Sequence, residues 1–287
     1  MHYTKETPTT ATVYGIMLPM MERESAEETY SPGERAIALV TFVVVSVAAL
    51  FLPAQGVLSS VCLLVLFLSG WVLLEVDLHI PAMYVLFFIL AYLTRILPIY
   101  SLGLMLLAPL LVFIVVSSIF EPLRPGIAWL RRGRITARGC LVGLAVVIVS
   151  GVSLVVWYRL FHPDISQFTE YLPRASGPVL LAAGLAFSIT NAVVEEFIFR
   201  GIMWEGLEEI TGRWEAALVI QAVIFGAAHW WGVPNGVVGV CLATIYGLMM
   251  GGVRYISGGL LLPIIVHVFA DIVIFTLILD MAGRLGG

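Results

Sequence analysis

Long apolar stretches, separated by short polar breaks, follow one another through most of the chain. Each is about as long as the roughly 20 residues that a helix needs to cross a bilayer, and none shows the strict alternation of a barrel strand. The pattern therefore predicts an all-α, polytopic membrane protein of about eight or nine transmembrane helices. The expected spans are 36–54, 56–76, 80–97, 99–120, 138–160, 178–210, 214–231, 236–256 and 258–280.

The composition favours a membrane protein over a soluble one. Hydrophobic residues make up 60% of the 287 residues and charged residues 12%, whereas a soluble domain has about 25% charged residues. The net charge of −4 comes largely from the N-terminal tail and the loops, which argues against a nucleic-acid partner. We expect a multi-pass integral membrane protein surrounded by lipids, in the cell membrane if the organism is prokaryotic.

The distribution of charge divides the chain into three parts. Residues 1–34 are polar and predict a loose, surface-lying tail, whereas residues 35–137 hold the first transmembrane helices and end in an arginine-rich loop. This loop should be cytoplasmic by the positive-inside rule. Residues 138–287 hold the remaining helices and the candidate catalytic core. The three cysteines are widely spaced, which predicts ordinary packing and neither a zinc site nor a disulfide framework.

Three charged residues lie close together in one of the most apolar parts of the chain, the stretch NAVVEEFIFRG. Placing each of Glu195, Glu196 and Arg200 inside a bilayer costs about 2.5–3.5 kcal/mol, so the group needs partners or a function. Glu196 and Arg200 are four residues apart on one helical face, in the order that pairs best. Glu195 points about 100° away and is left to act as a catalytic base or an ion ligand.

Later apolar spans carry polar residues that could meet Glu195. His229 and Glu195 are equally distant in sequence from the turn at Gly212, so neighbouring antiparallel helices would bring them to a similar depth. His267 and Asp271 are four residues apart on the last span, on one helical face. We therefore expect a polar cavity in the C-terminal helix bundle. The alternative is a purely structural role, in which these polar groups only hold the helices together.

Three motifs follow one another in this region: EExxxR (Glu195, Glu196 and Arg200), FxxxH (Phe225 and His229) and HxxxN/D (His267 and Asp271). In this order, on successive apolar segments, they resemble the CAAX protease and bacteriocin-processing family of intramembrane proteases, which includes the type II CAAX prenyl endopeptidases. The resemblance covers residues 178–280. It implies endoproteolysis in the membrane, on a peptide or lipidated peptide. In the type II enzymes the cut follows the prenylated cysteine and removes the C-terminal tripeptide.

The resemblance also implies roles for the residues. Glu195 would be the base that activates water, and His229 would hold and polarise that water. Glu196 and Arg200 would support Glu195. His267 and the residue at position 271 would stabilise the oxyanion, but an ionised aspartate cannot donate a hydrogen bond as asparagine can. We therefore interpret Asp271 as a residue that orients His267.

The sequence leaves two possibilities for a cofactor, a bound metal ion or none. Two histidines and a glutamate can bind a catalytic zinc or another divalent metal, and the ligands would then be Glu195, His229 and His267. The chain has no HExxH motif, and the three residues come from three separate helices. We therefore expect no cofactor.

Two other classes of function use the same buried charges. A proton- or ion-coupled transporter could use them as a relay, but the chain shows no inverted repeat, and the convergent charge lies in its second half. A non-catalytic membrane scaffold would need them only for helix association. Replacing Glu195 by glutamine would leave the function of such a scaffold intact.

Overall fold

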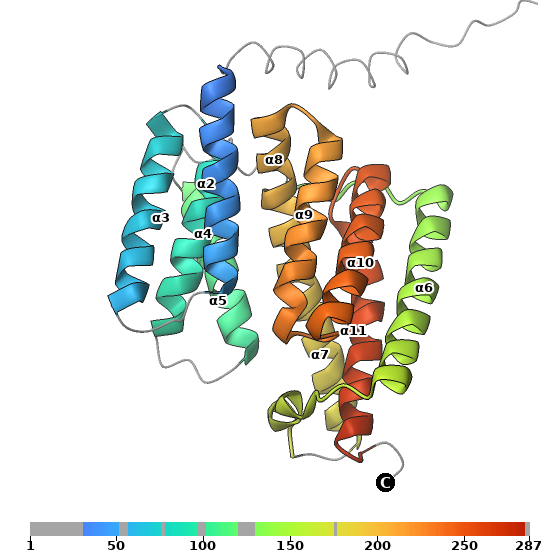
Figure 1. Ribbon diagram of the computed structural model, residues 1–287. Coiled ribbons are helices and arrows are strands. Elements are labelled where there is room, and N and C mark those ends of the chain that lie inside the picture. Colours follow the sequence, from blue (N-terminus) through green and yellow to red (C-terminus); the bar gives the residue numbers. More distant parts are fainter. Residues whose placement is uncertain are drawn as a thin grey trace, which may run out of the picture.

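The structure, a computed structural model, describes residues 31–51, 57–75, 78–96, 102–119, 130–174 and 177–284. The tail expected over residues 1–34 lies outside the described residues up to residue 30, as do residues 120–129 of the arginine-rich loop. Every regular element in the described ranges is a helix (Figure 1). The α-helices are α2 (Pro32–Phe51), α3 (Val57–Glu75), α4 (His79–Ile96), α5 (Leu102–Ile119), α6 (Ala137–Phe161), α7 (Gly177–Glu196), α8 (Trp204–Thr211), α9 (Trp214–Ala228), α10 (Gly236–Ser257) and α11 (Leu261–Met281).

The prediction of an all-α, polytopic membrane protein is confirmed, and the expected spans agree with the observed helices to within a few residues. In the described residues, four segments are long and apolar enough to cross a membrane. They are Ala137–Phe161, Gly177–Thr211, Gly236–Ser257 and Leu261–Met281. Large apolar side chains on the outer side of α6, such as Leu141 (69% exposed), are open to the surroundings, as a lipid-facing helix requires.

The span expected over 178–210 is not one regular helix. It consists of α7, a π-helical segment η4 (Phe197–Met203) and α8, and the break falls directly after the two glutamates. The span expected over 214–231 ends as a short 3₁₀ turn, η5 (His229–Trp231). A second 3₁₀ turn, η3 (Ser166–Tyr171), follows α6. Short π-helical insertions are frequent at functional sites, because they change the direction in which neighbouring side chains point.

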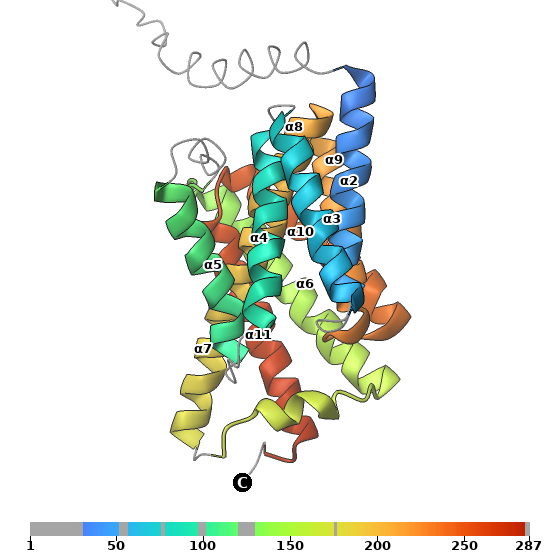
Figure 2. The ribbon, with the colours of Figure 1, turned by 90° about the vertical axis from the view of Figure 1, so that its left-hand side faces the viewer.

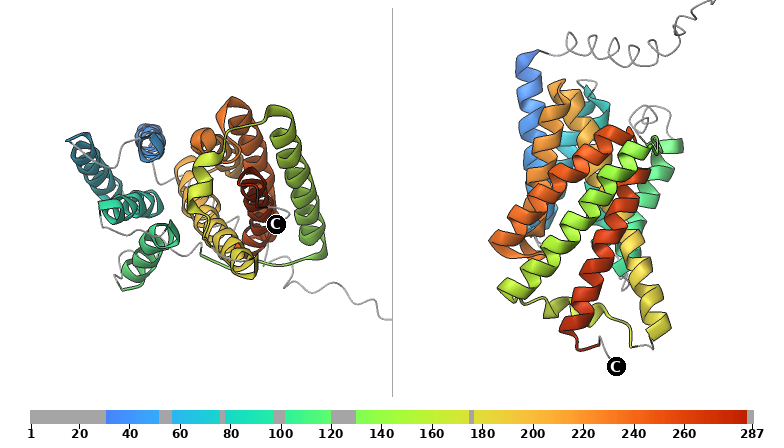
Figure 3. Two further views of the ribbon diagram at one scale, coloured as in Figure 1. Left: turned by 90° about the horizontal axis from the view of Figure 1, so that it is seen from below. Right: turned by 90° about the vertical axis from the view of Figure 1, so that its right-hand side faces the viewer.

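The helices form two neighbouring groups. Helices α2 to α5 lie beside the larger group of α6 to α11, as Figure 2 shows from the left and the left panel of Figure 3 from below. The two groups meet where α4 contacts α8 and η4, and where α5 contacts α7. The rings of Phe87, Phe113 and Phe197 pack together across this contact. A carboxylate from α8, that of Glu209, also accepts the backbone N–H of Ile80 at the start of α4.

Small residues let α9 and α10 pack closely, as the Gly247-xxx-Gly251 pattern indicates. A Cβ atom at Gly247 would lie 3.0 Å from Cα of Ala222. At Gly226 a Cβ atom would overlap the hydroxyl of Thr244. The tight contact sets the position of α9, and therefore of His229 at its end.

The described end of the arginine-rich loop is fixed to the turn between α10 and α11. The backbone N–H of Arg134 donates to the carbonyl of Ser257 at 2.7 Å, and that of Leu260 donates to the carbonyl of Arg131 at 3.0 Å. Gly133 has a φ of +76°, and a Cβ there would clash with the backbone of Gly259. This segment therefore ties the start of α6 to the start of α11.

Candidate active site

A cavity of about 440 Å³ lies among the helices of the C-terminal group. Helices α6, α7, α9, α10 and α11 contribute to its walls, together with η3, and most of the lining is apolar. Glu195, His229, His267 and Asp271 all line it. The structure thus brings together residues from three helices that the sequence predicted to converge.

Glu196 and Arg200 form the predicted ion pair. Nη1 of Arg200 lies 2.9 Å from Oε1 of Glu196, and both side chains are fully buried. The guanidinium carbon of Arg200 also lies 4.5 Å from the centre of the Phe225 ring, a cation–π geometry. The pair belongs to the protein interior and does not line the cavity, which leaves chemistry in the cavity to other groups.

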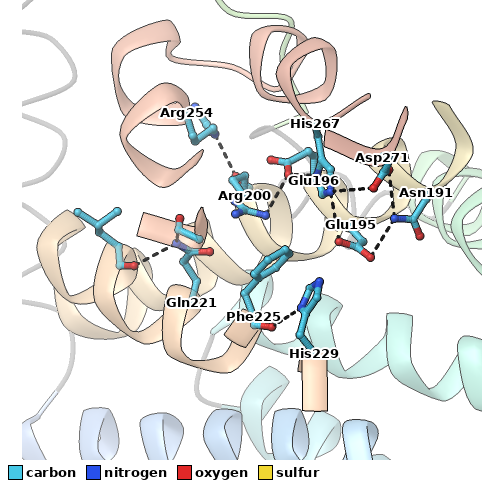
Figure 4. A network of polar contacts seen from close by, with 12 residues as sticks. Asn191, Glu195, Glu196, Arg200, Gln221, Phe225, His229, Arg254, His267 and Asp271 are labelled. Atoms are coloured by element: carbon cyan, nitrogen blue, oxygen red, sulfur yellow. Dashed lines mark hydrogen bonds and ion pairs between the residues drawn. The ribbon is translucent and has the colours of Figure 1, made fainter. Parts of the chain in front are cut away.

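His267 binds the same carboxylate oxygen. Its Nδ1 lies 2.6 Å from Oε1 of Glu196, and because a carboxylate only accepts, Nδ1 carries the proton and donates. The other ring nitrogen, Nε2, lies 3.5 Å from Oε2 of Glu195 and 3.7 Å from Oδ1 of Asp271. The imidazole therefore spans from the buried ion pair to the wall of the cavity (Figure 4).

Glu195 differs from its neighbour in exposure, because its side chain is 24% exposed whereas that of Glu196 is buried. Its Oε1 accepts a hydrogen bond from Nδ2 of Asn191 at 3.1 Å. The same Nδ2 donates to Oδ2 of Asp271 at 3.2 Å. Asn191 thus holds the two carboxylates of the cavity wall side by side, as Figure 4 shows.

Asp271 is less close to His267 than expected. The 3.7 Å between its Oδ1 and Nε2 exceeds hydrogen-bonding distance, whereas Glu196 contacts the ring at 2.6 Å. Glu196 is therefore the carboxylate that orients His267, and Asp271 has Asn191 as its hydrogen-bond partner.

His229 reaches the cavity from the end of α9. Its Nδ1 lies 2.8 Å from the backbone carbonyl of Phe225, so Nδ1 carries the proton and the other ring nitrogen, Nε2, is left free to accept. Figure 4 shows the ring on the side of α9 that faces Glu195. The FxxxH spacing thus has a physical meaning, because the residue four positions earlier supplies the carbonyl that sets the tautomer of His229.

One comparison with known protein families gave a match. Residues 177–273 match the family model described as type II CAAX prenyl endopeptidase Rce1-like. This part of the chain is similar to the CAAX protease family. The match includes all seven residues of the three motifs, and it supports a CAAX-type intramembrane protease in general terms. Comparisons with curated proteins and with solved structures gave no significant match.

The loop that follows η5 and the segment that follows α6 together close one side of the cavity. Phe168 and Tyr171 of η3 line the cavity, as does Val233. Gln167 donates to the backbone carbonyl of Trp231 at 3.3 Å, which connects η3 to the turn that carries His229. The shape of the cavity near His229 therefore depends on a segment outside the three motifs.

Three side chains around the candidate site were not singled out from the sequence. Asn191 is four residues before Glu195, a spacing that could have indicated the contact. Arg254 is a charged residue in an apolar span, a signal of the same kind as Glu195. Tyr246 lines the cavity, but nothing in its sequence surroundings distinguishes it.

The candidate metal ligands do not form a ligand cluster. In the part of the chain that the structure describes, no group of three histidine, cysteine, aspartate or glutamate side chains is placed to hold a metal ion. His267 already has a carboxylate near each ring nitrogen. The arrangement of Glu195, His229 and His267 does not fit a metal centre, and we derive no step through one.

Proposed function

We propose that this protein is a glutamate-type intramembrane endopeptidase that removes the C-terminal tripeptide of a prenylated, CAAX-type substrate. The family match of residues 177–273 supports the reaction class. The residue roles rest on the geometry of the cavity, and the choice of a prenylated substrate rests on the family and on the apolar lining.

The observation that supports this proposal is that two adjacent glutamates have different surroundings. Glu196 is buried and contacts both Arg200 and His267. Glu195 lines the cavity, where Asn191 is its hydrogen-bond donor among the described residues. A base must be reachable by water and substrate, so Glu195 is the glutamate that can take a proton during the reaction.

Glu195 and His229 activate the water together. The carboxylate side chain of Glu195 is 24% exposed at the cavity, and Nε2 of His229 is an acceptor because Nδ1 donates to Phe225. A water molecule can donate one hydrogen to each of these acceptors. Glu195 takes the proton as the water oxygen attacks the peptide carbonyl, and the C–N bond then breaks as this proton passes to the leaving amine. The products are a carboxylic acid, which then gives up its proton, and an amine that takes one up, so one water is consumed for each bond cut.

His267 stands beside the position where negative charge develops. Its Nε2 can donate to the oxyanion only when the ring carries both protons, since Nδ1 already donates to Glu196. Asp271 and Asn191 form the adjoining wall and hold the carboxylate of Glu195 in position.

The cavity suits an apolar substrate. Its lining includes Leu154, Phe187, Leu242, Ile274 and Ile278. Apolar surface of this kind favours a hydrocarbon chain over a polar peptide, by about 25 cal/mol for each Å² buried. Membrane lipids surround the helices and deliver such a substrate laterally.

The test is cleavage of a fluorogenic farnesylated CAAX peptide by the purified protein in detergent. Wild type should release the tripeptide, identified by mass spectrometry, and the same peptide without the farnesyl group should be cut more slowly. Glu195→Gln and His229→Ala should each lose at least about 100-fold in rate, the typical contribution of a general base.

Glu215→Gln is the matched control, because Glu215 is a 51% exposed glutamate near the start of α9. It should cleave at the wild-type rate. Full activity of Glu195→Gln would contradict the assignment of the base. No cleavage by folded wild type would contradict the prenylated substrate, and no cleavage of unlipidated membrane peptides as well would contradict the protease.

A further inference from the structure

Tyr246 of α10 lines the cavity together with Glu195 and the two histidines. Its ring meets that of His267 edge-on, with the ring centres 5.5 Å apart at an angle of 77°, and lies 6.0 Å from the ring of Phe225. The contact with His267 fixes the tyrosine next to the residue that stands beside the expected oxyanion.

The hydroxyl of Tyr246 is buried and has no hydrogen-bond partner among the described residues. A buried tyrosine hydroxyl usually finds a partner, because leaving one without costs about 1–3 kcal/mol. Tyr246 lines the same cavity as Glu195, His229 and Asp271. A phenol that keeps its O–H free at this place is poised to donate to something that enters the cavity.

The nitrogen donors of the lining residues Asn191, His229 and His267 are already used, whereas Nε and Nη2 of Arg200 have no partner among the described residues but belong to a side chain that does not line the cavity. Nδ2 of Asn191 donates to Glu195 and Asp271, and the Nδ1 atoms of His229 and His267 donate to Phe225 and Glu196. An ionised Asp271 has no proton to give. Among these described lining residues, the remaining donors are the hydroxyl of Tyr246 and the second N–H of a doubly protonated His267.

Ser150 and Ser153 of α6 and Tyr171 of η3 bring the other hydroxyls of the lining, and Tyr171 is 65% exposed. Oγ of Ser150 donates to the carbonyl of Val147 at 3.2 Å. Ser153 on α6 and Tyr171 on η3 belong to elements that carry none of the seven motif residues. Tyr246 is therefore the neutral hydroxyl donor that shares its surroundings with the motif residues.

We propose that Tyr246 is a further catalytic residue of this protein, whose hydroxyl donates a hydrogen bond to the oxyanion of the tetrahedral intermediate. The proposal rests on the proposed peptidase function. The hydrogen bond forms as the carbonyl carbon becomes tetrahedral and its oxygen becomes negative, and no proton leaves the phenol. Tyr246 supplies the neutral donor that an aspartate at position 271 does not provide.

The test compares Tyr246→Phe with wild type in the farnesylated-peptide assay. The substitution keeps the ring and its packing against His267 and Phe225 and removes one oxygen. We expect kcat to fall about 100-fold, as for removal of one oxyanion donor, and KM to stay within about twofold. The melting temperature should not fall, because the lost hydroxyl has no partner among the described residues.

Tyr255→Phe is the matched control on the same helix. Tyr255 is 53% exposed and stacks on Trp214 outside the cavity, so its kcat should equal that of wild type. A peptide aldehyde, whose hydrate imitates the tetrahedral intermediate, should bind Tyr246→Phe about 100-fold more weakly than wild type. Uncleaved substrate should bind equally to Glu195→Gln with and without Tyr246→Phe.

The outcomes separate this proposal from the peptidase function. Cleavage that Glu195→Gln abolishes and Tyr246→Phe retains in full would overturn the role of Tyr246 alone. A loss in Ser153→Ala together with full activity of Tyr246→Phe would assign the donor to Ser153. A fall in melting temperature with weakened substrate binding would make Tyr246 a packing residue. Absence of cleavage by wild type would overturn the peptidase function, and the role of Tyr246 with it.

Discussion

The Nδ1 atom of His267 lies 2.6 Å from Oε1 of Glu196, so the second glutamate of the pair holds the last histidine of the site. The same oxygen accepts a hydrogen bond from Nη1 of Arg200 at 2.9 Å. One buried carboxylate oxygen therefore connects α7 with α11 and also neutralises a fully buried guanidinium. A mutation of Glu196 should consequently affect both folding and catalysis.

Glu196→Gln should lower the free energy of unfolding by about 3–5 kcal/mol, because it leaves the buried charge of Arg200 without a counter-ion. It should also lower kcat by about 100-fold, because His267 loses the contact that orients it. Thermal unfolding in detergent and the farnesylated-peptide assay measure the two effects. Glu215→Gln, an exposed glutamate, should change the stability by no more than about 0.5 kcal/mol. Wild-type stability of Glu196→Gln would show that the ion pair does not stabilise the fold.

Arg254 supports the π-helical segment from α10. Its Nε donates to the backbone carbonyl of Arg200 at 3.0 Å, and its Nη2 forms an ion pair with Glu205, which also faces Arg131. Arg254→Lys should keep the charge but lose the fork that reaches the carbonyl and the carboxylate at once. We expect a loss of about 1.5–3 kcal/mol in stability and a reduced kcat.

Arg213→Lys serves as the control for Arg254→Lys. Its side chain is 71% exposed and its contact with Glu215, at 3.9 Å, is at the limit of an ion pair. The control should match wild type in stability and rate, both measured as for Glu196. An unchanged kcat in Arg254→Lys would mean that the π-helical segment keeps its shape without this contact.

The variant Gly226→Ala tests whether the position of α9 controls the placement of His229 in the cavity. A Cβ atom there would overlap the hydroxyl of Thr244 and come within 2.8 Å of the carbonyl of Val240, so Gly226→Ala should push α9 away from α10. We expect a loss of about 1–3 kcal/mol in stability and a lower kcat. At Gly252 a Cβ atom would meet nothing within 4 Å, and Gly252→Ala should fold at least as well as wild type. Equal activity of the two variants would contradict the coupling between helix packing and His229.

Metal removal tests the water-activation chemistry. The proposed reaction uses Glu195 and His229 directly on water, so the rate should be unchanged after treatment with EDTA or a phenanthroline chelator. The measurement is the initial rate of peptide cleavage before and after dialysis against chelator. A loss of activity that added zinc restores would contradict the metal-free mechanism and return Glu195, His229 and His267 to the role of ligands.

The sequence by itself determined the helices and the contacts within each helix. Runs of apolar residues must form helices in a membrane, because every backbone polar group there needs a partner within its own segment. The pair of Glu196 and Arg200 followed from a spacing of four residues, which one turn of helix brings together. The three motifs indicated which spans carry chemistry, and the family match covers the region where they lie.

The tertiary structure alone decided the contacts between helices. That Glu196 and not Asp271 orients His267, that Asn191 joins two carboxylates, and that Tyr246 faces the cavity all depend on how each helix is rotated and how deep it sits. Close packing at Gly226 and the π-helical break after Glu196 set these rotations and depths. Helical periodicity defines the faces of each helix, but the partner of each face is chosen by packing among all the helices together, which spacing along one segment does not contain.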